Sequence, residues 1–150
     1  MVTNAAIPST IISELLDDQW EVVNVAKPFI LEVNAPLDAV LRFDLNRGDA
    51  LFVRAEPATE QYRYHNAQKY FTKTAAVVVE IHTKQTRQIL YNLMEEIRRI
   101  CEVNTHLLDD FQFMKFTNFT EYTDEELNVW KGVVKIQMES SGVRSSYIQL

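Results

Sequence analysis

Glycine is scarce in this sequence, and its few glycines stand alone. There are three of them among 150 residues, at Gly48, Gly132 and Gly142. A loop that holds nucleotide phosphates needs closely spaced glycines at the start of a helix, because its backbone must approach the phosphates. The sequence therefore argues against a nucleotide-binding site of the common types.

Cysteine is rarer still, because Cys101 has no second cysteine with which to form an internal disulfide. A nucleophile hypothesis would pair this thiol with a histidine. However, Cys101 falls on the apolar face of a predicted helix, whereas a reactive thiolate needs a polar, positively charged neighbourhood. We interpret it as a small buried hydrophobic residue. No Gly-x-Ser-x-Gly motif offers a serine nucleophile instead.

Long apolar runs are also missing. No stretch of about 18 apolar residues occurs, so no membrane span is expected, and the N-terminus shows no secretory signal pattern. A hydrophobic fraction of 47% is ample for a core, and residues 1–150 are predicted to form one domain with a polar tail over residues 140–150. The formal net charge of −6 argues against a surface that binds nucleic-acid phosphates throughout.

Candidate metal ligands and acid–base residues are scattered along the chain. His65, His82 and His106 stand far apart, and none forms a helical pair with the spacing of metal ligands. The carboxylate runs at 109–110 and 124–126 lack a partner motif, and we interpret them as solvated loops. We therefore expect no catalytic residues, no metal and no cofactor, and we predict that the protein is not an enzyme.

The strongest pattern runs from Thr72 to Val103. Residues 73–82 contain a run of β-branched residues, whose stiff side chains favour a pleated strand. Over residues 86–103 the apolar residues recur at three- and four-residue steps, which places them on one face of a helix. They are Ile89, Leu90, Leu93, Met94, Ile97, Ile100 and Cys101. The pattern predicts a central strand followed by a long helix that packs on its sheet.

The chain before this unit begins with a shorter helix. Ser9–Gln19 has helical apolar spacing, and Ser9 or Thr10 is the candidate N-cap. The pattern then turns extended over residues 21–33. Because Pro28 cannot donate a ladder hydrogen bond, this segment is predicted to be an edge strand or an irregular arm.

A β-hairpin is predicted next. A turn over residues 34–38 leads into two alternating runs at 40–45 and 50–55, which flank the short glycine-containing loop 46–49. The tripeptide at 47–49 spells the cell-adhesion sequence Arg-Gly-Asp. The needs of a hairpin turn explain it, so adhesion is given little weight.

Three further strands are predicted around the long helix. They are Gln61–His65, which a connection over 66–71 joins to the central strand, then Phe111–Phe119 and Val129–Glu139. The acidic segment 120–128 is predicted to be a loop or one helical turn. Few helices and many strands indicate an α+β domain, with a mixed, largely antiparallel sheet, one long helix packed on it and a short N-terminal helix.

Aromatic and basic residues alternate at 62–65 and 69–73. This pattern resembles a weak binding site for single-stranded nucleic acid. A protein interface is the alternative, since tyrosine and arginine are enriched there. We favour the interface because the net charge of the chain is acidic.

The order of elements resembles that of the tail terminator proteins of tailed viruses, also called tail-completion or neck proteins of the head–tail connector. The likeness covers residues 9–140 and is one of layout, with 75–81 leading into 86–103 and the alternating strand at 130–136 near the end. It implies a structural virion subunit without catalytic residues that forms a hexameric ring. Such a ring caps the tail-tube protein, docks to a head-completion or connector protein, and lets DNA pass through its lumen without specific binding. Assembly would take place in the host cytoplasm, and the ring would lie at the tail or neck of the virion.

The resemblance directs attention to residues suited to contacts between subunits or with the tube. The candidates are Arg42, Arg47 and Asp49 near the predicted hairpin, and Tyr62 and Tyr64 in the aromatic segment. Two alternatives from other classes stay open. One is a small cellular ligand-binding or enzymatic domain with a site near His82, and the other is a nucleic-acid-binding module that uses residues 62–73.

Overall fold

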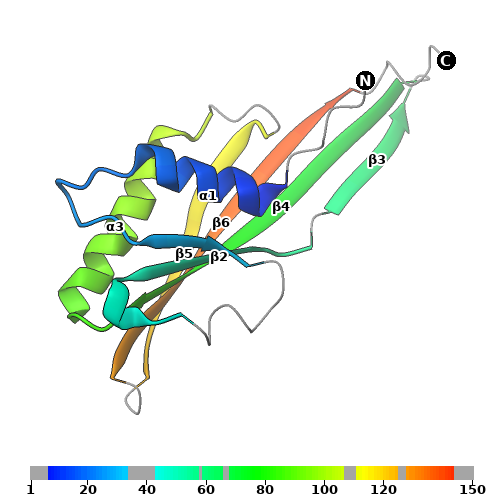
Figure 1. Ribbon diagram of the computed structural model, residues 1–150. Coiled ribbons are helices and arrows are strands. Elements are labelled where there is room, and N and C mark those ends of the chain that lie inside the picture. Colours follow the sequence, from blue (N-terminus) through cyan, green and yellow to red (C-terminus); the bar gives the residue numbers. More distant parts are fainter. Residues whose placement is uncertain are drawn as a thin grey trace, which may run out of the picture.

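One sheet with helices on one of its faces makes up the protein (Figure 1). The computed structural model describes residues 7–33, 43–57, 59–65, 68–106, 111–124 and 128–143. Within them the chain forms a six-stranded sheet of order β1-β2-β4-β6-β5, with β3 paired to β4 as well. The elements are α1 (Pro8–Gln19), β1 (Phe29–Glu32), the 3₁₀ turn η1 (Leu45–Arg47), β2 (Ala50–Ala55), β3 (Thr59–His65), β4 (Gln68–Thr83), α3 (Arg87–Val103), β5 (Phe113–Asp124) and β6 (Val129–Val143). The predicted α+β class is confirmed.

β4 is the central strand and spans 16 residues. β6 pairs with it antiparallel from Tyr70 to Thr83. The other edge of β4 is shared, because β2 pairs with residues 77–82 and β3 pairs with residues 68–74, both antiparallel. Among the described strands, only β1 runs parallel to its neighbour, β2. The sheet is thus mixed and largely antiparallel, as the sequence predicts.

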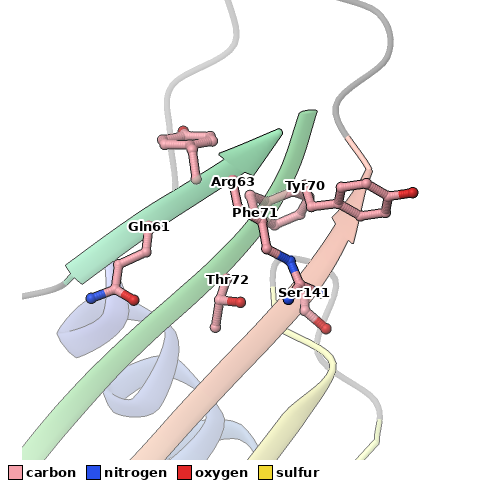
Figure 2. Close-up of a pocket in the computed structure, with 7 residues that line it drawn as sticks. Gln61, Arg63, Tyr70, Phe71, Thr72 and Ser141 are labelled. Carbon is pink, nitrogen blue, oxygen red and sulfur yellow. The ribbon is translucent and has the colours of Figure 1, made fainter. Parts of the chain in front are cut away.

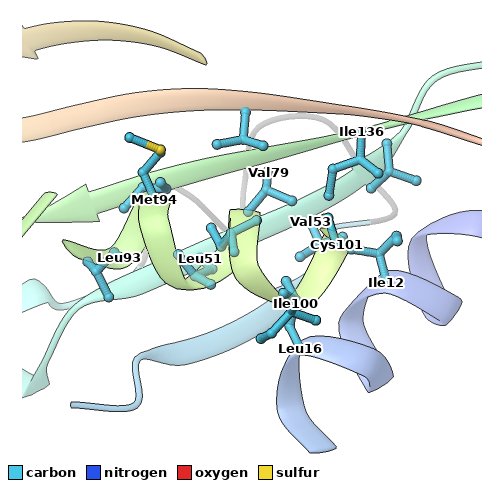
Figure 3. Close-up of a cluster of buried hydrophobic side chains, with 14 of the residues drawn as sticks. Ile12, Leu16, Leu51, Val53, Val79, Leu93, Met94, Ile100, Cys101 and Ile136 are labelled. Atoms are coloured by element: carbon cyan, nitrogen blue, oxygen red, sulfur yellow. The ribbon is translucent and has the colours of Figure 1, made fainter. Parts of the chain in front are cut away.

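The core lies between the helices and the sheet (Figure 3). Thr86 caps α3, since its Oγ1 accepts a hydrogen bond from the backbone N–H of Ile89 at 3.2 Å. The buried apolar face of α3 consists of Leu90, Leu93, Met94, Ile97, Ile100 and Cys101. Burying each large aliphatic side chain contributes about 1.5–3 kcal/mol. Among the described residues, no helix is long and apolar enough to cross a membrane.

The short helix α1 lies where the sequence predicts it, but it is capped differently. Pro8 occupies its first turn, and Ile12 and Leu16 face the core. No side chain caps the helix. The hydroxyls of Ser9 and Thr10 instead donate to the Glu32 carboxylate on β1, at 2.9 and 2.7 Å. The predicted cap is therefore wrong, because the helix begins at Pro8 with Ile7 at the N-cap position, which places Ser9 and Thr10 inside the first turn.

The predicted hairpin of 40–45 with 50–55 is also wrong. Leu45–Arg47 forms a 3₁₀ turn, in which the Asp44 carboxylate accepts from the backbone N–H of Asn46 at 3.0 Å. β2 pairs with β1 and β4 instead. Apolar packing favours this turn, because Phe43 and Leu45 pack on Phe52 in a small second core at the other face of the sheet. The predicted turn at 34–38 and residues 40–42 lie outside the described residues.

The strands of the sheet run further than the sequence predicts. β4 begins at Gln68, within the predicted connection, and β5 continues to Asp124 through most of the predicted acidic loop. β6 extends to Val143, so residues 140–143 belong to the sheet rather than to the predicted tail, and residues 144–150 lie outside the described residues. Pairing with a neighbouring strand satisfies the backbone groups of each extension, which local polarity does not reveal.

Gly132 stands at a point of close approach between two layers. A Cβ atom there would lie 2.5 Å from the Phe119 ring and 3.2 Å from Leu90. The glycine lets β5, β6 and α3 meet without a gap.

Candidate assembly surface

Three strands reach beyond the helices at one end of the sheet (Figure 1). We call this region the arm, and it consists of β3, residues 68–74 of β4 and residues 139–143 of β6. β3 pairs with β4 on one side only, and no described strand pairs with its outer edge. A strand edge of this kind presents backbone N–H and C=O groups that can pair with another chain.

A cavity of about 590 Å³ lies at the arm (Figure 2). Its lining combines aromatic, hydroxyl and amide groups with one guanidinium group, and consists of Gln61, Tyr62, Arg63, Tyr70, Phe71, Thr72 and Ser141. The Arg63 guanidinium lies 5.6 Å from the centre of the Tyr70 ring. Tyr62 is 43% exposed. We call this cavity the arm cavity. An exposed cavity lined by tyrosines and an arginine is typical of a protein interface.

The base of the arm is joined to the core. The Lys73 ammonium lies 4.6 Å from the centre of the Phe111 ring, which is buried in the core. Ala75, the next residue on the same face of β4, is buried as well. The arm is therefore an extension of a well-packed strand.

The predicted interface residues fall into two groups. Tyr62 and Tyr64 lie on β3 in the arm, and of Tyr64 the structure describes the backbone pairing with Lys69. Arg47 is the last residue of η1 and Asp49 lies two residues after it, just before β2. Arg42 is outside the described residues. The structure thus does not bring the five candidates together.

Asp49 serves the fold of its own subunit. It is buried, its Oδ2 accepts a hydrogen bond from Gln85 Nε2 at 2.8 Å, and its backbone oxygen accepts from the N–H of Phe29 at 2.9 Å. The Arg47 guanidinium lies 5.1 Å from the centre of the Phe29 ring. Of these two residues, Arg47 is the one whose side chain can be changed without removing a buried hydrogen bond.

The sheet face opposite the helices carries a network around Glu80. Tyr122 donates its hydroxyl to Glu80 Oε1 at 2.7 Å, and Arg54 approaches Glu80 Oε2 at 3.4 Å. Burial, together with the hydrogen bond to the Glu80 carboxylate, raises the pKa of Tyr122. These contacts join β2, β4 and β5 across the face and keep the Tyr122 phenol neutral.

His82 and Cys101 are both buried. Burial lowers the pKa of His82 to about 4, where Lys131 adds to the effect and Glu80 opposes it. The His82 ring packs edge-on against the Phe52 ring at 4.8 Å between centroids, and its Nε2 has no hydrogen-bond partner in the part of the chain that the structure describes. Burial likewise raises the pKa of the Cys101 thiol to about 12, so this thiol is not a thiolate at neutral pH. The described residues contain no group of three or more His, Cys, Asp or Glu placed to hold a metal ion.

Sequence reasoning found Tyr62 and Tyr64 but missed the arm that carries them. It assigned residues 66–71 to a connection and 140–150 to a tail. The available signal was the run of β-forming residues at 70–72, which continues directly into the β-branched run of the central strand.

The fold is known from other structures, although the sequence is not close to them. No family model matches the chain, and no curated protein matches it either. Among solved structures, one match covers 90% of this chain and 95% of a chain described as "Virion of native gene transfer agent (GTA) particle". The TM-score is 0.58 and the sequence identity is 9%. At this identity the match shows a shared fold.

Proposed function

We propose that the protein is a structural virion subunit that caps a tail tube and joins tail to head as a ring through which DNA passes. The observation that carries this proposal is the fold match over nearly the whole length of both chains to a chain from a virion particle. The role is structural rather than catalytic. Its partners are further copies of the chain, the tail-tube protein and a head-completion or connector protein, and its place is the tail or neck of the virion.

Ring formation gives a use to the open strand edges of the arm. In a ring, each subunit contacts a neighbour on two different sides, so an exposed edge becomes an interface rather than a site of aggregation. The arm cavity beside the outer edge of β3 is suited to the same contact. The acidic net charge of −6 suits a lumen through which DNA must slide, because like charge weakens binding to phosphates.

The oligomeric state of the purified chain, measured by light scattering and by electron microscopy, tests the proposal. We expect rings of about six subunits, formed by the chain alone or on addition of the tube protein. A monomer that persists at high concentration, with and without the tube protein, would contradict it. Binding to oligonucleotides that weakens with salt would instead favour the nucleic-acid-binding alternative.

Arg47 stays a candidate contact with the tube or a neighbour. The Arg47→Ala substitution should reduce joining of tails to heads while the free energy of unfolding stays near that of the unsubstituted chain. Unchanged tail joining in this variant would remove Arg47 from the interface. An Asp49 substitution is a poorer test, because it removes the buried hydrogen bond to Gln85 and so perturbs folding.

A further inference from the structure

A turn between α1 and β1 presents two valines to solvent. We call residues Glu21–Asn24 the valine turn, because Val22 is 68% exposed and Val23 is 86% exposed. The sequence predicts an extended segment here, and the structure shows a turn instead, closed by a hydrogen bond from Asn24 N–H to the Glu21 carbonyl at 3.0 Å. Two adjacent valines at the tip of a turn are exposed apolar surface without a role in the subunit's own core.

A buried carboxylate from α3 holds the valine turn in place. Glu96 is 2% exposed, and it accepts hydrogen bonds from the Glu21 N–H at 2.8 Å and from Asn24 Nδ2 at 3.0 Å. Arg99 donates to both oxygens of the same carboxylate, at 2.7 and 2.8 Å. Removing a charge from water is costly unless it is paired and hydrogen-bonded, and here every part of that requirement is met.

Two further hydrogen bonds hold the backbone on either side of the valine turn. Trp20 donates its indole N–H to the Val25 carbonyl at 3.0 Å, and Arg99 also donates to the Gln19 carbonyl at 2.8 Å. The backbone is thus fixed on both sides of the exposed valines. A pre-ordered apolar projection loses little conformational freedom when a partner covers it, and this is what a docking element requires.

The arm and the valine turn lie at opposite ends of the molecule (Figure 1). The arm cavity of about 590 Å³ has room for both isopropyl groups, and its aromatic lining suits them. Charge is complementary as well. Arg63 is the charged residue among those that line the cavity, whereas exposed Asp18 lies just before the valine turn and exposed Glu21 begins it. One copy therefore carries both halves of a contact that it cannot make with itself.

We propose that Val22 and Val23 of one copy insert into the arm cavity of the next copy, and that this head-to-tail contact closes the ring. The proposal rests on the ring of the proposed function and names the surfaces that build it. Two different patches meet in such a contact, so it is heterologous, and it forms a closed ring when the rotation between copies closes.

Substitution of both valines tests the contact. Val22→Asp combined with Val23→Asp should weaken ring assembly by roughly 10-fold or more, as loss of central interface side chains does. The thermal unfolding midpoint should change little, because neither side chain packs in the core. Val103→Asp is the matched control, since Val103 is a valine on α3 that is 58% exposed. Rings that form equally well from the double variant would overturn the contact and leave the proposed function standing.

Disulfide trapping tests the pairing itself. Val23→Cys and Gln61→Cys chains, mixed under mild oxidation, should yield a mixed disulfide dimer, while Val103→Cys mixed with Gln61→Cys should not. The native Cys101 is buried and its thiol pKa is raised, so it does not compete. A ring that assembles without the mixed disulfide overturns the contact alone. A chain that stays monomeric both with and without the tube protein overturns the proposed function together with this contact.

Discussion

The two halves of β4 show how one strand serves two purposes. Residues 77–82 lie under the helices, and on the face toward them Val77, Val79 and Ile81 are fully buried. Residues 68–74 pair with β3, and from Tyr70 onward also with β6, but they lie beyond the helices. The covered half is aliphatic, and the arm half is aromatic, hydroxylated and basic. Backbone pairing thus continues the strand beyond the helices, while the side chains decide whether its surface packs in the core or stays outside it.

The covered half should dominate stability. Ile97→Ala removes a fully buried side chain of α3 that faces it, and we expect a loss of about 2–5 kcal/mol in the free energy of unfolding. Chemical denaturation with a two-state fit measures this loss. A loss below about 1 kcal/mol would mean that the core under α3 is not the main source of stability.

The opposite face of the covered half should respond to acid through His82. Its pKa is lowered to about 4 in the folded protein, whereas an unfolded histidine titrates near 6.5. Stability is therefore complete above the unfolded pKa and is lost as the pH falls from about 6.5 toward 4. We expect a loss of about 2 kcal/mol between pH 7.5 and pH 5. His82→Gln should remove that part of the dependence, and an unchanged profile in this variant would show that His82 is not its source.

The close packing of β6 against β5 and α3 should be sensitive to any side chain added at Gly132. Gly132→Ala places a methyl group against the Phe119 ring, and overpacking of this kind costs about 1–3 kcal/mol. Gln137→Ala on the same strand, with its exposed side chain on the other face, is the control and should change stability by about 0.5 kcal/mol at most. Equal unfolding free energies for the two variants would contradict the close approach of β5 and β6 at this point.

The arm should give the smallest change in stability and the largest change in assembly. Tyr62→Ser should shift the free energy of unfolding by about 0.5 kcal/mol at most, yet reduce ring assembly by roughly 10-fold. Tyr122→Ser should do the reverse. Tyr122 is similarly exposed, but its hydroxyl donates to Glu80, so its loss should destabilise the subunit and leave assembly intact. A Tyr62 variant that assembles normally would separate the arm from the interface.

The strand–helix unit could be predicted because its pattern is long and consistent. β-branched residues fill the central strand, and α3 repeats its apolar residues over 17 positions. The predicted hairpin at 40–55 failed because Phe43 and Leu45 alternate like strand residues but pack as part of a turn on Phe52. The local half of the arm was missed because residues 66–71 were read as a connection, although β3 and β4 already pair from His65 and Gln68. The other half was missed because β6 lies far away in the chain, and Ser141 opposite Thr72 gives no local sign of a ladder.

The candidate site was predictable only in part. Aromatic residues next to basic ones drew attention to Tyr62, and this residue does lie at the arm cavity. The valine turn was missed, because Glu96 and Arg99, which hold it, are separated from it by more than 70 residues. Asp49 was predicted as a contact from its place near the predicted hairpin, whereas its carboxylate accepts a hydrogen bond from Gln85 inside the subunit.

The most direct test of the central claim is a particle image of the protein assembled from purified chains, with tail-tube protein added. The account predicts closed rings in which the valine turn of each copy meets the arm of its neighbour. Isolated subunits, with the arm and the edge of β3 facing solvent in every class of particle, would contradict it.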